Sequence, residues 1–437
     1  MLTPTRRKSA VLRQCLNPGR VFCFTLIVFI LLPGAQAQSG RKVDLSNLVV
    51  IGDSLSAGFQ NGSLLAEQQI HGYASLVAGQ AGVDLDFVLP LILPPGIPNV
   101  ITSVSLGPPP VIQRAPGASL GRVDKSAQPR NLAVPGATVS DALNARPTCV
   151  FDNFTDFVLG LPQPCLGTGQ ALSQTETAAT LNPTTIFVWL GSEDALGAAI
   201  NGDSSLLTPP ASFETAFAAV LSNLDATGAK LVVANVPDVT RIPFFTPAPV
   251  AAGLFGVPVP LFLLTLGLGA GDLLTPDAFP LIAPILLGQA SLPLPSNVVL
   301  DATEIAAIRS ATQAYNTAIA NQAAAHGSPL VDVAGLYESI QVKGVVVGGQ
   351  RLTAAFFGGI FSLDGIHPTN TGYALIANEF IRALNTSYSA GIPPLSLRQV
   401  QKSDPLVFPG VGHPPSALGT ISPEIVESLR TVLGKKR

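Results

Sequence analysis

The sequence predicts an α/β fold, a three-layer α/β/α sandwich built on a mostly parallel sheet with apolar, proline-rich insertions. Two observations lead to this prediction. Short runs rich in β-branched residues alternate along the chain with longer segments of helical character. Strand, crossover and helix follow one another throughout, which favours parallel strands covered by helices on both faces.

The first strand is expected at residues 48–51, and Gly52 ends it. Further strands are predicted at residues 185–190, 230–235 and 329–333, with a short strand running into a glycine turn within residues 130–138. Helices are predicted at residues 71–81, 213–224, 301–326 and 371–384. Ser140 and Asp141 are expected to cap a small additional helix.

Two long stretches carry no charge. Residues 87–113 contain many prolines, which excludes a regular helix or a central strand and predicts an apolar insertion loop. In residues 242–271, prolines leave at most about ten apolar residues before Asp272, whereas a membrane-spanning helix needs about 20. This second stretch therefore predicts a lid, a wall of an acyl pocket or a plain buried insertion rather than a span.

The beginning of the chain has the pattern of a signal peptide. Five basic residues precede or flank an uncharged run at residues 21–32, and Ala35-Gln36-Ala37 matches a cleavage site. We therefore expect residues 1–37 to be removed and the protein to be secreted or periplasmic. Residues 38–388 are expected to form one α/β domain, followed by a proline-rich tail at residues 389–437 with a short helix near 423–433.

Charge and cysteine content narrow the function. Without the signal segment, 19 basic residues face 27 acidic ones, a net charge of about −8 that argues against nucleic acid as a partner. Cys149 and Cys165 would remain, and an oxidising compartment predicts a disulfide between them. No metal-binding motif is present, and we expect neither a metal nor a cofactor.

Ser54 is the best candidate nucleophile. It follows the first strand and Asp53, at the carboxyl end where open α/β sheets bind ligands. An ordinary turn or a helix cap is the competing interpretation of this triplet.

A serine nucleophile needs a base, and the base needs an orienting acid. The other three histidines have no acid at a useful spacing. His367 lies three residues after Asp364, and Pro368 keeps it out of the helical conformation. The alternative for this pair is a solvated turn.

Together these segments resemble the GDSL (SGNH) family of serine esterases and lipases. Gly52-Asp53-Ser54-Leu55 matches its first block, Gly136 the glycine of its second, Gly191-Ser192-Glu193-Asp194 its third, and Asp364 with His367 its last. The resemblance implies a flavodoxin-like sandwich and a catalytic triad of Ser54, His367 and Asp364. It also implies an oxyanion hole formed by Ser54, Gly136 and the residue at position 193.

Glu193 departs from this pattern, because the family has an asparagine there. An ionised carboxylate would repel the oxyanion, and loss of one donor typically costs about 10²–10³ in kcat. Three alternatives remain open. Glu193 stays protonated and donates, another donor such as Ser192 replaces it, or catalysis is impaired.

The resulting expectation is an exported carboxylic ester hydrolase that acts on lipid or medium-chain acyl esters and makes transient contact with a lipid surface. A carbohydrate O-acetyl esterase is one alternative. A catalytically impaired protein that binds lipids or surfaces is the other, because of Glu193. An α/β-hydrolase with a G-x-S-x-G elbow is disfavoured, since the required second glycine is absent after Ser54.

Overall fold

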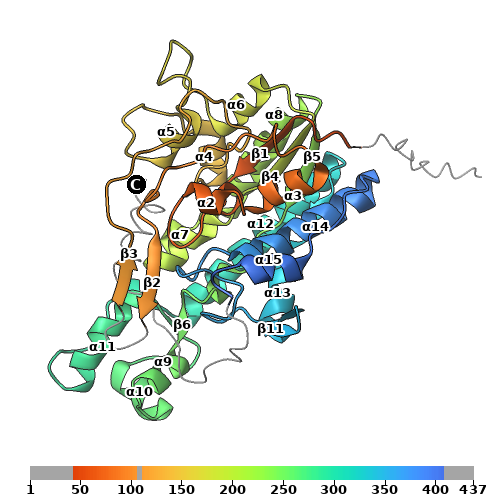
Figure 1. The fold of residues 1–437 in the computed structure, drawn as a ribbon. Coiled ribbons are helices and arrows are strands. Elements are labelled where there is room, and N and C mark those ends of the chain that lie inside the picture. Colours follow the sequence, from red (N-terminus) through yellow and green to blue (C-terminus); the bar gives the residue numbers. More distant parts are fainter. Residues whose placement is uncertain (1–42, 106–110, 408–437) are drawn as a thin grey trace, which may run out of the picture. The chain divides into compact units, whose positions relative to one another are not determined.

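A parallel sheet forms the centre of the fold (Figure 1). The computed structural model describes residues 43–105 and 111–407, all within one compact unit. The sheet has the strand order β1-β4-β5-β9, with strands β1 Leu48–Gly52, β4 Thr185–Trp189, β5 Lys230–Ala234 and β9 Leu330–Val331. All its pairings are parallel, with Gly52 opposite Trp189. The predicted mostly parallel sheet is confirmed.

Residues 130–134 run along the free edge of β1. Val50 N–H donates to Arg130 O (2.9 Å), and Leu132 N–H donates to Val50 O (2.9 Å). The predicted strand is nevertheless reduced to a single parallel bridge at Asn131. The reason is that Gly52 N–H, which would continue the ladder, donates to Gln174 Oε1 (3.1 Å) instead, although Val134 N–H still donates to Gly52 O (3.0 Å).

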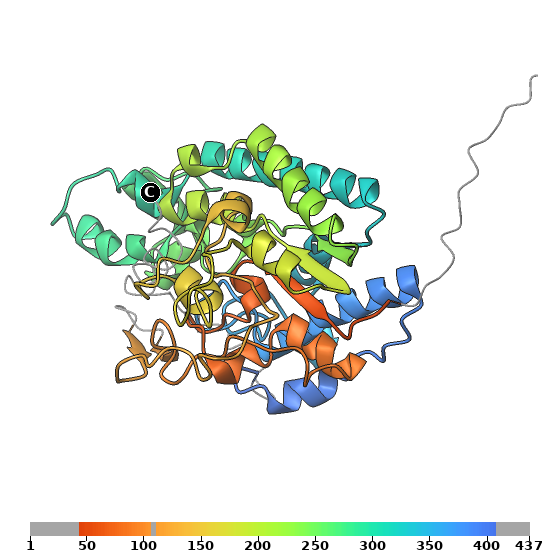
Figure 2. The same ribbon diagram turned by 90° about the horizontal axis from the view of Figure 1, so that it is seen from above.

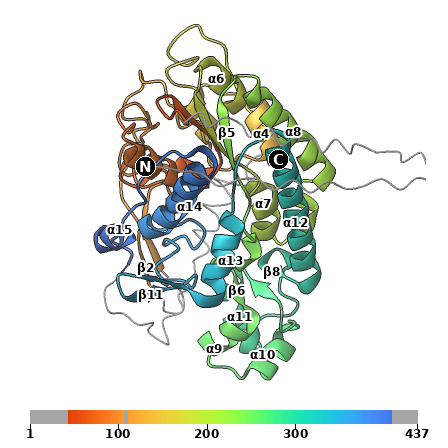
Figure 3. The same ribbon diagram turned by 90° about the vertical axis from the view of Figure 1, so that its right-hand side faces the viewer.

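Helices cover both faces of the sheet (Figures 2 and 3). On one face lie α4 Val139–Asn144, α7 Glu193–Asn201, α8 Pro210–Asp225 and α12 Ala302–Ala325. On the other, α3 Tyr73–Ala81 packs against α14 Asn370–Tyr388. The three-layer sandwich is therefore confirmed. The cap of α4 differs from the expectation, because Thr138 is its N-cap and Asp141 only completes the capping box.

Shorter elements complete the sandwich. They are α1 Ser54–Ala57, α2 Ala66–Gln69, α5 Phe154–Leu159, α6 Gln174–Thr180, α13 Val333–Lys343 and the hairpin of β10 Val345–Val347 with β11 Gln350–Leu352. The core lies between the sheet and its helices. Trp189 is fully buried in it, and its indole N–H donates to Asn235 O (3.0 Å), which satisfies the one polar atom of that side chain.

The first uncharged insertion contains more structure than the loop that we expected. β2 Ile101–Ser105 and β3 Val111–Arg114 form an antiparallel hairpin outside the central sheet. Both strands fall on stretches without proline, where every backbone N–H can pair. The strands found here belong to a separate hairpin and not to the central sheet, so the expected loop is corrected to a loop that contains a hairpin.

The second uncharged insertion and the residues after it, up to 300, fold around a small hydrophobic cluster of their own. The insertion itself forms β6 Thr246–Pro247, α9 Ala248–Leu254 and α10 Val259–Leu266, and the residues after it form β7 Leu273–Leu274, α11 Phe279–Leu286 and β8 Val299–Leu300. Among the described residues, no single helix has the length and apolarity to cross a membrane. The pair of α9 and α10 reaches that length and apolarity only when the two helices are counted together, and they are bent by 110° relative to each other.

The described beginning of the predicted tail packs on the domain. α15 Leu397–Ser403 lies against α14. After it, Asp404 Oδ2 accepts from the N–H (2.7 Å) and the hydroxyl (2.8 Å) of Thr371. The expected signal segment and the helix expected near residues 423–433 lie outside the described residues.

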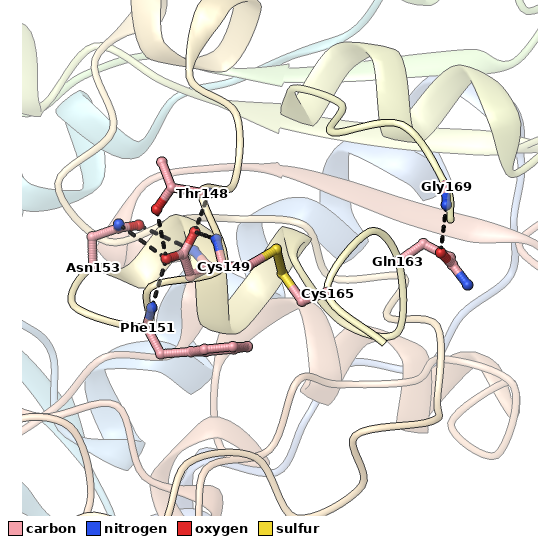
Figure 4. Close-up of a disulfide and its surroundings, with 8 residues drawn as sticks. Thr148, Cys149, Phe151, Asn153, Gln163, Cys165 and Gly169 are labelled. Carbon is pink, nitrogen blue, oxygen red and sulfur yellow. Dashed lines mark hydrogen bonds between the residues drawn. A yellow bond between two sulfur atoms is a disulfide. The ribbon is translucent and has the colours of Figure 1, made fainter. Parts of the chain in front are cut away.

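A disulfide joins Cys149 to Cys165, as predicted, with an S–S distance of 2.02 Å (Figure 4). The loop beside it is organised by the carboxylate of Asp156, which accepts from the backbone N–H groups of Thr148, Cys149 and Phe151. Disulfide and carboxylate together hold the segment that leads into α5.

We expect the double variant Cys149→Ser/Cys165→Ser to lose about 3 kcal/mol of unfolding free energy, since the bond closes a loop of 16 residues. Urea denaturation without reductant measures this loss. Wild-type protein denatured with reductant is the control and should match the variant. Equal midpoints for the oxidised wild type and the variant would contradict the prediction.

Candidate active site

Ser54 stands where β1 turns into α1. Asp53 is the N-cap of that short helix, and its Oδ1 accepts from Leu55 N (3.0 Å). The turn requires glycine at position 52, because a Cβ there would lie 2.3 Å from Ser56 Oγ and 2.8 Å from Trp189 O. This close packing places the Ser54 hydroxyl at the carboxyl edge of the sheet.

The structure brings together Ser54, His367 and Asp364. Nε2 of His367 lies 2.9 Å from Ser54 Oγ, although the two residues are 313 positions apart. Nδ1 of the same ring lies 3.0 Å from Asp364 Oδ2. Both side chains of the His–Asp pair are fully buried, so the alternative of a solvated turn does not hold.

The carboxylate of Asp364 is held by backbone N–H groups. Oδ1 accepts from Ile366 (2.8 Å) and His367 (2.8 Å), and Oδ2 accepts from Gly62 (2.7 Å). Burial acts to raise the pKa of Asp364, but the attraction of His367 and these hydrogen bonds outweigh it, and the pKa lies below its usual range. The carboxylate therefore stays ionised and can orient the imidazole.

His367 is also fixed by its surroundings. Gly365 adopts a positive φ of 71°, which lets the chain turn between the acid and the histidine. The carbonyl of His367 accepts from Ser362 N (2.8 Å), and the ring of Phe59 lies 4.7 Å from the imidazole ring. These contacts restrict the ring to an orientation that faces Ser54.

A cavity of about 30 Å³ adjoins Ser54. His367 and Glu193 line it, together with Pro237, Val239 and Ile242 from the segment after β5. Ile242, the first residue of the second insertion, is the part of that insertion which reaches this cavity. The cavity has the size of a small reacting group rather than of a whole ligand.

Two backbone N–H groups, of Ser54 itself and of Gly136, are candidate hydrogen-bond donors to a substrate. Within the described part of the chain, the N–H groups of Ser54 and Gly136 donate to no protein acceptor. Gly136 has a φ of 80° and lines a larger groove of about 860 Å³ rather than the small cavity. Its turn is held in place by Asp194, whose Oδ2 accepts from Val139 N (3.0 Å).

Glu193 is buried at the first position of α7, with 6% of its surface exposed. Its Oε1 has no hydrogen-bond partner among the described residues. Burial, and then repulsion from Asp53 and Asp194, raises the pKa of Glu193 well above its ordinary value. This shift favours the protonated carboxyl, whose O–H can donate a hydrogen bond.

Two neighbouring acids were not predicted as site residues. Burial raises the pKa of Asp53 to about 7 and that of Asp194 to about 6. Both stand beside predicted residues in the sequence, Asp53 before Ser54 and Asp194 after Glu193. Asp53 follows β1 and Asp194 follows β4. Because these two strands are neighbours in the sheet, the sequence could have predicted that the two acids lie close together.

Among residues 43–105 and 111–407, no group of three or more His, Cys, Asp or Glu side chains is arranged to hold a metal ion.

We expect Asp194→Asn to stabilise the protein increasingly as pH rises. Asparagine keeps an oxygen for Val139 N–H but cannot ionise. In the wild type, the pKa of Asp194 is 3.8 in the unfolded chain and about 6 in the folded protein. The folded state therefore holds a proton that the unfolded state has already released, and the unfolding free energy falls as pH rises between these two values. The difference in unfolding free energy between variant and wild type should grow by up to about 3 kcal/mol.

Urea denaturation at about pH 4 and about pH 7.5 tests this expectation. Asp84→Asn, at an exposed position on the chain, is the matched control. A difference between Asp194→Asn and wild type that is equal at both pH values would contradict it.

Comparisons with known proteins identify the family of the chain. The family model for GDSL-like lipase/acylhydrolase matches residues 48–380. Among solved structures, the chain is similar to phospholipase A1 from Streptomyces albidoflavus NA297, with 16% identity over 78% of this chain and 98% of that one and a TM-score of 0.32. It is also similar to a variant of the acetyl-xylooligosaccharide esterase from Geobacillus Stearmophilus, with 12% identity over 79% and 96% of the two chains and a TM-score of 0.36.

Comparison with curated protein sequences finds no match. The family model spans about three quarters of the chain and includes Ser54, Gly136, Glu193, Asp364 and His367. The resemblance inferred from the sequence is thereby confirmed, and the protein belongs to the GDSL-like lipase/acylhydrolase family of carboxylic ester hydrolases.

Proposed function

We propose that Ser54, His367 and Asp364 form the catalytic triad of this ester hydrolase. The supporting observation is the buried chain of hydrogen bonds from Asp364 through His367 to the Ser54 hydroxyl. An ionised Asp364 keeps the proton of the imidazole on Nδ1, which leaves Nε2 free to accept the serine proton.

The reaction begins when Ser54 Oγ attacks the ester carbonyl carbon and His367 Nε2 takes the hydroxyl proton. The carbon–oxygen bond to the alcohol then breaks, and the alcohol leaves with the proton from His367. A water molecule next attacks the acyl-enzyme, gives its proton to His367, and releases the carboxylic acid while the proton returns to Ser54 Oγ. The balance is one ester and one water to one acid and one alcohol.

We assign the stabilisation of the oxyanion to the N–H groups of Ser54 and Gly136 and to the protonated carboxyl of Glu193. The two N–H groups have no acceptor among residues 43–105 and 111–407, and Glu193 lines the cavity beside Ser54. A neutral carboxylic acid can donate a hydrogen bond where the family has an amide. This assignment favours an active enzyme over a catalytically impaired binding protein.

Esters with lipid or medium-chain acyl groups are the substrates we propose. The groove that begins at Gly136 has a volume of about 860 Å³ and largely apolar walls, which Ile97 and Pro98 of the first insertion help to form. Trp189, the one tryptophan, is fully buried and offers no surface on which a sugar ring stacks. These features support acyl esters over acetylated carbohydrates.

We also propose that the protein is exported. The disulfide between Cys149 and Cys165 supports an oxidising compartment, because such bonds are rare where glutathione keeps thiols reduced.

Replacement of the nucleophile tests the proposed function. Ser54→Ala should lower the turnover of p-nitrophenyl esters, from acetate to palmitate, on the order of 10⁴-fold or more, because no attacking oxygen remains. Ser222→Ala, at an exposed position of α8, is the matched control and should retain turnover. Turnover that persists in a purified Ser54→Ala preparation, or a wild type that cleaves no ester, would contradict the proposal.

The role of Glu193 has its own signature in the pH profile. As pH rises through the raised pKa of Glu193, its carboxyl ionises and repels the oxyanion, so wild-type kcat should fall by about 10²–10³. Glu193→Gln keeps a neutral donor at every pH and should lose this alkaline fall. Glu214→Gln, exposed on α8, serves as the control. An unchanged alkaline limb in Glu193→Gln would exclude the proposed role.

A further inference from the structure

The groove beside Gly136 combines apolar walls with one buried cation. Its apolar side chains come from the first insertion (Ile97), from the segment after that insertion (Leu120), and from the loop that the disulfide closes and the residue after it (Phe151, Phe154 and Leu166). Phe154 packs edge-on against Phe59, whose ring in turn contacts His367. One wall of the groove is therefore linked to His367 through the ring of Phe59.

The cation is Arg122, with only 2% of its surface exposed. Backbone pairing fixes its position, because Leu93 N–H donates to Gly121 O (2.8 Å) and Val123 N–H donates to Leu91 O (2.8 Å). Two of its N–H groups donate to the carbonyls of Leu161 (2.7 Å) and Ala127 (2.6 Å). Its Nε has no partner in the described part of the chain.

No carboxylate among the described residues pairs directly with this guanidinium. Arg122 has no ion pair within 4.0 Å there, and the side chain of Asp124 accepts from the hydroxyl (2.6 Å) and the N–H (2.8 Å) of Ser126. Burial lowers the pKa of Arg122 to about 10 against the longer-range attraction of Asp124, so the group remains charged at neutral pH. A buried charge without a directly paired carboxylate is costly in free energy.

The remaining charged residues of the groove leave it with more positive than negative charge. Lys125 lines it from an exposed position, whereas its one acid, Asp152, is exposed and accepts from Asn153 Nδ2 (2.8 Å). The groove thus has two cations against one acid, in a protein whose net charge is −3. A neutral hydrogen-bond donor would be sufficient to bond the carbonyls of Leu161 and Ala127. These two contacts therefore do not explain why the buried side chain is a charged guanidinium.

We propose that the groove binds an anionic group of the ester substrate, a carboxylate or a phosphate, and that Arg122, assisted by Lys125, selects for it. The guanidinium has further N–H groups that match either oxyanion. This inference rests on the proposed ester hydrolysis and refines its substrate class to acyl esters that carry a negative charge away from the scissile bond.

Four matched esters test the proposal. Butyl hexanoate is the neutral reference. The hexanoyl ester of γ-hydroxybutyrate places a carboxylate on the alcohol side, the hexanoyl ester of propanediol monophosphate places a phosphate there, and monobutyl adipate places a carboxylate at the end of the acyl chain. The ratio of kcat/KM for each anionic ester to that for butyl hexanoate is measured within one enzyme preparation, so that the fraction of folded protein cancels.

We expect the wild type to prefer at least one anionic ester by about tenfold or more, the size of effect that one charge-assisted hydrogen bond produces. Arg122→Met should abolish that preference and Arg122→Lys should retain part of it. Lys125→Met should reduce it by a few fold. Lys402→Met, which removes a cation from α15 outside the groove, is the matched control and should keep the wild-type ratio.

The pattern of results separates this inference from the proposed function. Ratios near one for all three anionic esters, or a preference that Arg122→Met and Lys125→Met leave unchanged, would overturn the anion site while ester hydrolysis stands. The anionic ester with the highest ratio identifies which oxyanion is bound and on which side of the scissile bond. Absence of Ser54-dependent turnover on every ester, the neutral one included, would instead overturn the proposed function itself and the anion site that rests on it.

Discussion

The hydrogen bonds of Asp364 tie together parts of the chain that are far apart in sequence. Its carboxylate accepts from Gly62, just after the first strand and turn, and from the backbone around His367. The same carboxylate orients the imidazole that contacts Ser54. Because all of these groups are buried, loss of the acid would leave several N–H groups unpaired as well as a misaligned histidine. Assembly of the site therefore depends on this one side chain.

The carboxyl edge of the parallel sheet explains why the other residues gather beside this pair. Ser54 follows β1, Glu193 follows β4, and Gly136 follows the segment that runs along the free edge of β1. Adjacent parallel strands end at the same edge, so turns that are more than fifty residues apart meet there. Asp194 adds a direct link, because it bonds the first turn of α4 after Gly136. The parallel sheet brings these turns to one edge, and hydrogen bonds of side chains such as Asp194 fix the turns relative to one another.

The electrostatics of the site are unusual for a protein with so few charges, 12% of its residues. Burial is the main cause that raises the pKa values of three carboxyl groups, Asp53, Glu193 and Asp194, and the first and last of these also repel a charge on Glu193. The attraction of His367 and several hydrogen bonds instead lower the pKa of Asp364. Similar side chains thus have pKa values shifted in opposite directions because their partners differ. A separate buried cation, Arg122, marks the groove, so charge is concentrated where we propose that the substrate binds.

The sequence by itself determined the sheet, the principal helices, the disulfide and the family, because β-branched runs, helix caps and ordered motifs are local signals. It also singled out Ser54, Gly136, Glu193, Asp364 and His367, whose catalytic roles remain predictions. Only the tertiary structure decided the rest. The raised pKa of Glu193 depends on burial beside Asp53 and Asp194, and the hairpin of the first insertion depends on pairing between its strands. The position of Arg122 in the wall of the groove depends on loops that are brought together there. These properties arise from contacts between distant segments, which no local pattern encodes.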